Sequence, residues 1–410
     1  MLKDKLDRVL LKVQKPARYI GGELNSVIKD KKEVDIRFAF CFPDTYEVGM
    51  SHLGMKILYS LLNERNDTWC ERVFSPWLDF EEEMIKSNIP LYGLESLEPL
   101  TEFDIIGFTL QYELSFNTIL NMLKLGGVPL KCTERKGLKN LIVAGGPCAC
   151  NPEPLADFID LFMLGEGEEV MMELMDLYKE SKKNNDIKED FLIKAAQIEG
   201  VYVPALYAVS YNEDNTVKAI TPTHNAPAKV TKRIIKDLDQ VFYPKNFIVP
   251  FIGTIHDRAI VEVMRGCLRG CRFCQAGFIY RPLREKDAQT LVGNSHNLCE
   301  TTGYEEISLS SLSTSDYSQL EGLLTEIIDY TNDNNINMTL PSLRVDNFSE
   351  ELLDKIASVR KSGLTFAPEA GTQRMRDVIN KGVSEEDLKD ATRKAFEMGW
   401  DSVKLYFMIG

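Results

Sequence analysis

Three cysteines in one short stretch have the spacing that most clearly indicates chemistry. Cys267, Cys271 and Cys274 form a C-x3-C-x2-C pattern within V-E-V-M-R-G-C-L-R-G-C-R-F-C-Q-A-G-F-I-Y-R-P-L-R, residues 261–284. A disulfide would use only two of these thiols, and a structural zinc site normally takes four nitrogen or sulfur ligands. Thiolates are the usual ligands of iron–sulfur clusters. The spacing therefore favours a [4Fe–4S] cluster with one iron left open, over a zinc knuckle or three unrelated buried cysteines.

This loop resembles the signature loop of the radical S-adenosylmethionine (SAM) enzymes, with the aromatic Phe273 directly before the last cysteine. The resemblance implies that the three cysteines hold the cluster and that the open iron chelates the amino and carboxylate groups of SAM. It also implies that Phe273 lies against the adenine. A one-electron donor such as a flavodoxin or ferredoxin would be a partner.

Composition narrows the class of protein. The chain has 410 residues and a net charge of −14, which argues against broad nonspecific nucleic-acid binding. The sequence contains no apolar run of about eighteen residues, so no transmembrane helix is predicted. The N-terminus is charged and therefore does not read as a signal peptide. Nine cysteines, an odd number, indicate a reducing compartment. We expect a cytoplasmic protein with no membrane partner.

The stretch around the three cysteines is locally basic, in contrast to the acidic chain as a whole. Its basic residues are Arg265, Arg269, Arg272, Arg281, Arg284 and Lys286.

The first half of the chain alternates strand and helix patterns, which predicts an α/β fold with a doubly wound, Rossmann-like domain. Residues 1–33 read as an opening helix and lead-in, and residues 34–180 as the domain itself. Residues 181–245 read as a connector that contains an exposed polar stretch, 181–190, and a β-hairpin. The strands of the domain are predicted near residues 36–43, 73–75, 104–110 and 140–146, and its helices near 52–63, 115–125 and 166–178.

The glycine motifs of this domain resemble the cobalamin-binding-type domain found in front of many radical SAM enzymes. They are G-G-P at residues 145–147 and G-E-G-E-E at 165–169. The cobalt-ligating motif of that family is D-x-H-x-x-G, whereas residues 44–54 read D-T-Y-E-V-G-M-S-H-L-G. His52 is therefore expected in the first turn of its helix rather than on a cobalt. Cobalamin bound without a histidine ligand, and no cobalamin, both stay open.

Three further cysteines raise the alternative of a second iron–sulfur cluster. Cys41 ends one predicted strand, and Cys148 and Cys150 follow another, so these residues would lie at the same sheet edge. Such a cluster would resemble the methylthiotransferases. The alternative is that they are buried as small hydrophobic residues. Cys70, Cys132 and Cys299 are expected to be structural.

Residues 246–410 read as a run of β/α units, typical of a barrel. The radical SAM core is a partial barrel of six such units, and only five strands can be counted. We therefore expect the last unit to be missing and the chain to be a truncated version of a longer one. The strands are predicted at residues 259–264, 306–311, 337–345, 363–369 and 402–410, and the helices at 287–301, 317–331, 349–362 and 384–398.

The resemblance also suggests SAM contacts at the strand ends of this barrel. Ser311, Ser313 and Thr314 stand where the family usually has G-G-E, and Arg344 ends the third strand. Glu369 and Arg374 lie in A-P-E-A-G-T-Q-R-M-R, residues 367–376, where Glu369 would bind SAM and Arg374 would pair with it. Ordinary interior ion pairs are the alternative for each of these residues.

The phrases R-G-C-x-R-G-C-R-F-C-Q-A-G from Arg265 and Y-R-P-x-R from Tyr280 resemble a bacterial branch of radical SAM proteins with a cobalamin-binding-like domain. The resemblance implies reductive cleavage of SAM and methyl or methylthio transfer to RNA or another large substrate. Modification of a peptide or small metabolite is the alternative. A non-catalytic iron–sulfur protein for electron transfer or redox sensing is the alternative of another class.

Overall fold

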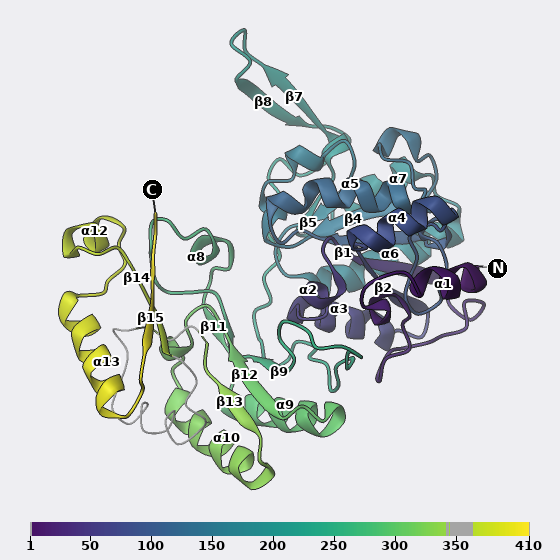
Figure 1. The fold of residues 1–410 in the computed structure, drawn as a ribbon. Coiled ribbons are helices and arrows are strands. Elements are labelled where there is room, and N and C mark those ends of the chain that lie inside the picture. Colours follow the sequence, from purple (N-terminus) through teal and green to yellow (C-terminus); the bar gives the residue numbers. More distant parts are fainter. Residues whose placement is uncertain (1, 342–343, 345–363, 410) are drawn as a thin grey trace. The chain divides into compact units, whose positions relative to one another are not determined.

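The computed structural model describes residues 2–341, 344 and 364–409 (Figure 1). The chain divides into two compact units. Met1–Ile235 and Phe242–His256 form the first, and Lys236–Val241 and Asp257–Gly410 form the second. The predicted helix at 349–362 and most of the stretch 342–345 lie outside the described residues.

A six-stranded sheet in the order β2-β1-β3-β4-β5-β6 forms the centre of the first unit. The first five strands are parallel and β6 is antiparallel to β5. The order 2-1-3-4-5 is that of flavodoxin-like doubly wound folds, so the prediction of a doubly wound domain is confirmed. The strands are β1 (Ile36–Phe42), β2 (Thr68–Phe74), β3 (Ile105–Thr109), β4 (Leu141–Gly145), β5 (Leu161–Met163) and β6 (Val201–Tyr202).

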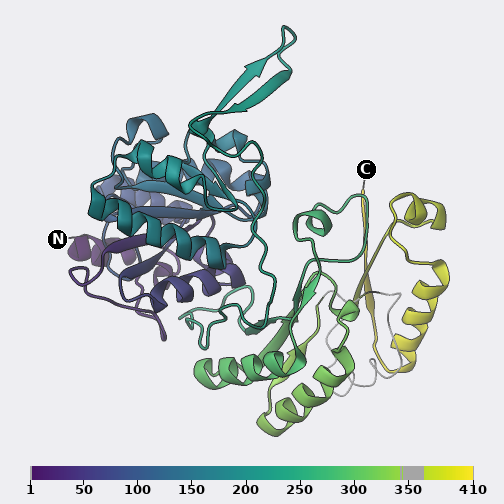
Figure 2. The same cartoon turned by 180° about the vertical axis from the view of Figure 1, so that it is seen from behind.

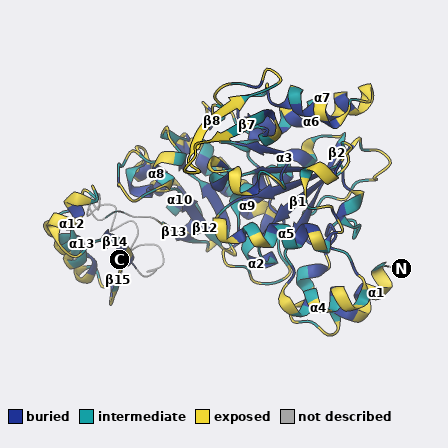
Figure 3. Ribbon diagram, turned by 90° about the horizontal axis from the view of Figure 1, so that it is seen from above, coloured by how far each residue is buried: buried dark blue, intermediate teal, exposed yellow. Residues whose placement is uncertain are grey.

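Every residue of β1, β2 and β3 is buried (Figure 3). Parallel strands covered on both faces read as nearly continuous apolar runs, which is why I-R-F-A-F-C-F forms β1. The helices of this unit are α1 (Leu2–Leu10), α2 (Tyr46–Gly49), α3 (Leu53–Glu64), α4 (Leu78–Ser87), α5 (Phe116–Leu125), α6 (Gly167–Asn184) and α7 (Lys188–Ala195).

Two details of the first unit correct the sequence prediction. The polar stretch 181–190 is largely helical, since α6 runs on to Asn184 and α7 starts at Lys188. Lys188 is buried and lies 2.6 Å from Asp160, so this stretch is not simply exposed. The short strand β5 was not predicted from the sequence, because three apolar residues are too few to show the alternation of a strand.

The predicted hairpin forms from β7 (Tyr207–Tyr211) and β8 (Val217–Pro222), and it projects from its unit (Figures 1 and 2). None of the described helices has the length and apolar character needed to cross a membrane.

The second unit contains the five predicted strands in two parallel sheets, one with the order β13-β12-β9 and one that pairs β14 with β15. The antiparallel pair of β10 (Met264–Arg265) and β11 (Arg284–Glu285) closes the base of the cysteine loop. The main strands are β9 (Ala259–Glu262), β12 (Glu306–Ser310), β13 (Asn337–Thr339), β14 (Leu364–Glu369) and β15 (Val403–Phe407). The helices are α8 (Ala276–Ile279), α9 (Ala288–Thr302), α10 (Leu320–Asn334), α12 (Gln373–Val378) and α13 (Glu385–Glu397).

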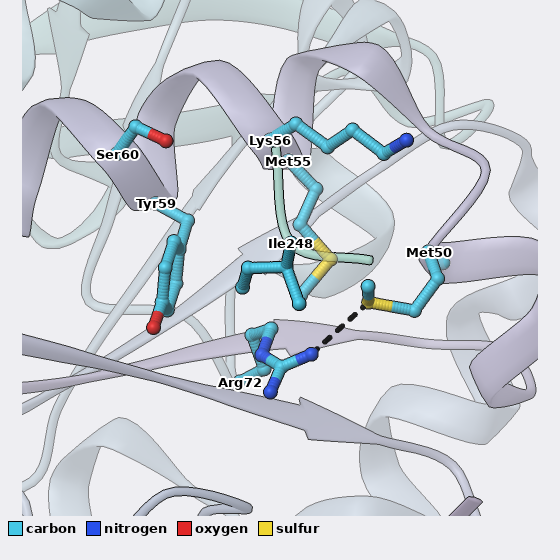
Figure 4. Close-up of a pocket in the computed structure, with 8 residues that line it drawn as sticks. Met50, Met55, Lys56, Tyr59, Ser60, Arg72 and Ile248 are labelled. Atoms are coloured by element: carbon cyan, nitrogen blue, oxygen red, sulfur yellow. Dashed lines mark hydrogen bonds between the residues drawn. The ribbon is translucent and has the colours of Figure 1, made fainter. Parts of the chain in front are cut away.

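A fully buried arginine ties together distant segments of the first unit. Arg72 on β2 forms ion pairs of 2.7 Å with Glu23 and with Glu95, and all three side chains are nearly inaccessible. A small pocket beside it is lined by residues that include Met50, Tyr59 and Arg72, and its cavity volume is about 10 Å³ (Figure 4). Small-molecule sites typically measure ~300–1,000 Å³, and the guanidinium is already bound by two carboxylates. We therefore read this pocket as structural.

Replacing Arg72 with Met should lower the free energy of unfolding by about 3–5 kcal/mol, because two buried carboxylates lose their cation. Urea denaturation followed by circular dichroism measures this change. Adding Glu23→Gln and Glu95→Gln to the variant should restore part of the loss. A change below about 1 kcal/mol for Arg72→Met would contradict a structural role for the cluster.

Candidate functional site

The carboxyl ends of three parallel strands meet at one edge of the second unit. Glu262, the last residue of β9, pairs in register with Ser310, the last residue of β12. Ser308 pairs in turn with Thr339, the last residue of β13. Chemistry in β/α barrels gathers at this edge, and the cysteine loop begins here.

The cysteine loop, residues 266–284, has a defined local structure. It starts at Gly266, whose φ of +88° and close approach to the carbonyl oxygen of Pro282 leave no room for a side chain. The backbone N–H of Cys274 donates to the carbonyl of Cys271 at 3.1 Å, and the N–H of Gly277 donates to the Cys274 sulfur at 3.4 Å. Cys271 is buried, while Cys267 and Cys274 are partly exposed. The turn thus holds one thiol inside and two toward the surface.

The donor types of this loop fit an iron–sulfur cluster, since it carries three free thiols and the N–H of Gly277 reaches one sulfur. Within the described ranges, no three His, Cys, Asp or Glu side chains are already gathered around one point as for a single ion. The assignment of Cys267, Cys271 and Cys274 therefore rests on donor type and on their position at the strand edge.

An ion pair fixes the cysteine loop to the segment after β12. The Arg269 guanidinium donates to both oxygens of Asp316, with Nε–Oδ2 at 2.9 Å. Two parallel bonds of this kind fix orientation as well as distance. Burial opposes the charge of Asp316, but hydrogen bonds from Arg269 and Ser313 and the nearby charges of Arg269 and Arg344 hold its pKa below the usual range.

The predicted hydroxyl residues gather in this same segment, which ends in a 3-10 turn (η8, Thr314–Asp316). Ser311 Oγ and Thr314 Oγ1 lie 2.9 Å apart, and Ser313 Oγ donates to Asp316 at 2.7 Å. Thr314 also donates to the carbonyl of Pro341 at 2.8 Å, beyond the end of β13. The hydroxyls therefore stabilise the strand edge itself.

Arg344 and Glu369 lie close to one lysine that the sequence analysis did not single out. The Arg344 guanidinium donates to the carbonyl oxygen of Lys381 at 3.1 Å. Lys381 Nζ lies 3.4 Å from Glu369 Oε1 and 5.9 Å from the centre of the Phe273 ring. Lys381 thus connects three of the predicted SAM-contacting residues.

The predicted pair between Glu369 and Arg374 is not formed in the described part of the chain, where Glu369 pairs with Lys381 instead. Arg374 is exposed and points a nitrogen at the Met375 sulfur, at 3.5 Å. It lies in the first turn of α12 (Gln373–Val378).

The backbone at Glu369 has a conformation unusual for a residue with a side chain. Its φ is +67°, and the N–H of Ala370 donates to the carbonyl of Pro368 at 2.8 Å, which closes a three-residue turn. Such a conformation costs of order 1–3 kcal/mol and is found preferentially at functional sites. This observation supports a binding role for the Glu369 carboxylate.

The basic side chains of the cysteine loop make contacts inside the second unit. Arg265 donates to Glu262 at 2.9 Å, and the Arg272 guanidinium donates to the carbonyl of Val378. Arg281 lies over the Phe278 ring, and Lys286 is almost fully buried. Contacts within the unit therefore account for several of these basic side chains, while Arg272 and Arg281 are exposed.

The first unit has its own strand edge of the ligand-binding kind, at the point where β1 and β3 diverge. Asp44 follows β1 and accepts a hydrogen bond from the Tyr112 hydroxyl, which follows β3, at 2.8 Å. His52 is the N-cap of α3, and its Nδ1 accepts from the N–H of Met55 at 3.1 Å. The expectation that His52 begins its helix is confirmed, and Nδ1 is occupied there.

The cysteines proposed for a second cluster differ in surroundings. Cys41 lies inside β1 with no exposed surface, and burial raises its thiol pKa well above the usual value. Cys148 is buried and Cys150 is exposed, in the 3-10 turn Pro147–Cys150 after β4. Strand β3 separates β1 from β4, so the two groups do not follow neighbouring strands.

Comparison with known families now identifies the class of protein. Residues 54–204 match the family described as "Radical SAM proteins, N-terminal", and residues 261–410 match the "Radical SAM superfamily". The two matches together cover most of the chain. The chain therefore belongs to the radical SAM superfamily, as its cysteine loop predicted.

Among curated proteins, the chain is similar to two from Methanocaldococcus jannaschii. The uncharacterized protein MJ0966 is 28% identical over 375 residues, which cover 91% of this chain and 69% of that protein. The putative methylthiotransferase MJ0865 is 26% identical over 148 residues, 34% of this chain and 32% of that protein.

Two solved structures have a similar fold. The radical SAM methyltransferase TsrM from Kitasatospora setae, solved with cobalamin and a [4Fe–4S] cluster, has a TM-score of 0.59 at 15% identity, covering 91% of this chain and 69% of that one. The cobalamin-dependent SAM radical enzyme OxsB has a TM-score of 0.55 at 15% identity, covering 92% and 50%. The fold is thus that of a radical SAM protein with an N-terminal cobalamin-binding-like domain.

His52 should make the stability of the protein depend on pH. Burial lowers its pKa to about 4, opposed by a hydrogen bond with Gln111, whereas the unfolded value is ~6.5. As the pH falls below ~6.5 the unfolded state gains a proton first, so stability present at pH 7 is lost toward pH 4. Because the side chain keeps some exposure, we expect about 1–2 kcal/mol less stability at pH 5 than at pH 7.

His52→Asn keeps a good N-cap residue but cannot titrate in this range. The difference in unfolding free energy between pH 7 and pH 5, measured in urea, should therefore be smaller in this variant. An equal difference in both proteins would rule out His52 as its source.

Proposed function

We propose that this protein binds a [4Fe–4S] cluster through Cys267, Cys271 and Cys274 and uses SAM to methylate an organic substrate. The observation that carries the proposal is the three-cysteine loop at the carboxyl end of β9, in a chain that matches the radical SAM superfamily over residues 261–410. The reduced cluster would supply one electron to a first SAM, whose C5′–S bond would break to give methionine and a 5′-deoxyadenosyl radical; this radical would take a hydrogen atom from the substrate and become 5′-deoxyadenosine. A second SAM would supply the methyl group and become S-adenosylhomocysteine. A flavodoxin or ferredoxin would supply that electron.

The residues of the chain have the following proposed roles. The thiols hold the cluster, and Phe273 packs against the adenine. Glu369, in its strained turn, accepts hydrogen bonds from SAM, and Arg344 attracts its carboxylate. Ser311, Ser313 and Thr314 shape the edge beside it. Arg374 is proposed only as a peripheral contact, because it points toward Met375.

Cobalamin is proposed as the second cofactor, on the first unit. The similarity in fold to TsrM and OxsB supports it, as does the switch point between β1 and β3. His52 is not proposed as the cobalt ligand, because its Nδ1 caps α3 and residues 44–54 lack the D-x-H-x-x-G motif. Cobalamin would bind without a histidine.

Methyl transfer is favoured over methylthio transfer. The similarity to the putative methylthiotransferase covers only a third of the chain, and Cys41 is sealed inside the sheet. RNA remains the substrate class suggested by resemblance. Arg265 and Arg269 give it no support, because they form ion pairs within the unit. A peptide or small metabolite is the second candidate. We also propose a cytoplasmic location, because such clusters are sensitive to oxygen.

Anaerobic reconstitution of the complete protein with iron, sulfide, SAM and a reductant tests the proposal. We expect about four irons per chain, with 5′-deoxyadenosine released by reductive cleavage and S-adenosylhomocysteine formed by methyl transfer. A reduced cluster that never consumes SAM would favour a non-catalytic iron–sulfur protein. About eight irons per chain would instead indicate two clusters and would support the second cluster at Cys41, Cys148 and Cys150.

Cys271→Ala should abolish both the cluster and SAM consumption, because the thiolate is a ligand. Cys299→Ala is the matched control, since Cys299 is a buried free cysteine on α9 of the same unit and is not part of the cysteine loop. Iron content and product analysis by mass spectrometry measure both. Retention of a full cluster in Cys271→Ala would refute the ligand assignment.

Cobalamin binding should survive His52→Asn. The optical spectrum after incubation with cobalamin and desalting should be the same for this variant and the native protein. Loss of the bound cobalamin spectrum in the variant alone would show that His52 is a ligand after all.

A further inference from the structure

The short turn after α12, residues 378–381, contacts both intervals between the three cysteines; we call it the brace turn. The first interval, C-x3-C, contains Gly270, whose carbonyl oxygen accepts from Asn380 Nδ2 at 2.8 Å. The second, C-x2-C, contains Arg272, whose N–H donates to the carbonyl of Ile379 at 2.9 Å. Its guanidinium also donates to the carbonyl of Val378.

The brace turn is itself fixed to the second unit. Arg376, on α12, is almost fully buried and donates to the carbonyls of Val383 and Ala370, at 2.9 and 3.0 Å. Lys381 lies beside Glu369, and its carbonyl accepts from Arg344. The turn therefore contacts the cysteine loop on one side and two of the proposed SAM-binding residues on the other.

The side chain of Asn380 is not needed by the helix that it follows. Asn380 has a φ of +54°, and the N–H of Lys381 donates to the carbonyl of Arg376 at 2.9 Å, which is the Schellman ending of a helix. Glycine is the usual residue at this position. Asparagine also adopts this conformation, and in addition it supplies an amide that reaches the cysteine loop.

We infer that Asn380 is a positioning residue that holds the cysteine loop in the shape that receives the cluster. The hydrogen bond to the Gly270 carbonyl comes from the amide of Asn380, which lies outside the cysteine loop. This inference rests on the proposed function for the identity of the cluster, but the contact itself involves only residues of this chain.

Asn380→Gly removes the amide while leaving the helix ending with its preferred residue. Asn380→Asp keeps the size and the backbone tolerance but turns an oxygen toward the Gly270 carbonyl. Asn335→Gly is the matched control: Asn335 ends α10 with a φ of 55° and the same Schellman hydrogen bond, from Ile336 to Thr331 at 2.9 Å. It is exposed and lies on another helix of the same unit.

The first measurement uses the protein without iron. Alkylation of Cys271 by iodoacetamide, followed by mass spectrometry, should be about fivefold faster in both Asn380 variants, the factor that ~1 kcal/mol for one hydrogen bond represents. Asn335→Gly should match the native protein. Equal rates in all four proteins would overturn the inference, whatever the cluster does.

The second measurement uses the reconstituted protein. Both Asn380 variants should lose iron to a chelator about fivefold faster than the native protein and Asn335→Gly, and the electron paramagnetic resonance spectrum of the reduced cluster should differ from native. Native rates and spectra in both Asn380 variants would overturn the positioning role. Failure of the native protein itself to bind iron, with faster alkylation in the variants, would refute the proposed function while leaving the brace intact.

Discussion

Parallel pairing of β12 with β9 on one side and with β13 on the other is the constraint on which the site depends. Each strand hydrogen-bonds its neighbour in a register that brings Glu262, Ser310 and Thr339 toward the same edge. Segments far apart in the sequence therefore leave the sheet together. The cysteine loop, the hydroxyl segment and Arg344 then meet within hydrogen-bonding distance of shared partners. Without the common direction of these strands, Arg269 could not reach Asp316.

The parallel sheet of the first unit also has a carboxyl edge, but its buried strands carry charged residues that form ion pairs. Its strands are buried on both faces, yet β1 and β2 carry Arg37, Glu71 and Arg72. Each of these charges is tolerated because a partner of opposite sign lies within 2.7 Å. These ion pairs attach residues 1–33, through Glu23, and the loop after β2, through Glu95, to the sheet. Asp44 and Tyr112 lie at the carboxyl edge and pair with each other.

The sequence was sufficient for the parts of the molecule that depend on local pattern. Apolar runs predicted β1, β3 and β4, whereas only the end of β2 was predicted, because T-W-C-E-R-V-F is not a continuous apolar run. The three cysteines predicted the superfamily. It was not sufficient where function depends on contacts between distant segments. Lys381, Asn380 and Asp316 carry ordinary types at ordinary spacing, so nothing in the pattern separated them from surface residues. Likewise, the sequence suggested Arg374 as the partner of Glu369, whereas the structure pairs Glu369 with Lys381.

The arginines of the cysteine loop show why composition alone misleads about ligands. A loop that bends around three thiols makes few hydrogen bonds within itself, so its carbonyls and those of its neighbours need donors from side chains. Arginine has five such donors in a rigid plane. Arg269 and Arg272 use them on Asp316 and on Val378. A basic loop in an acidic chain is thus explained by the folding of the loop, and its positive charge need not be a binding surface.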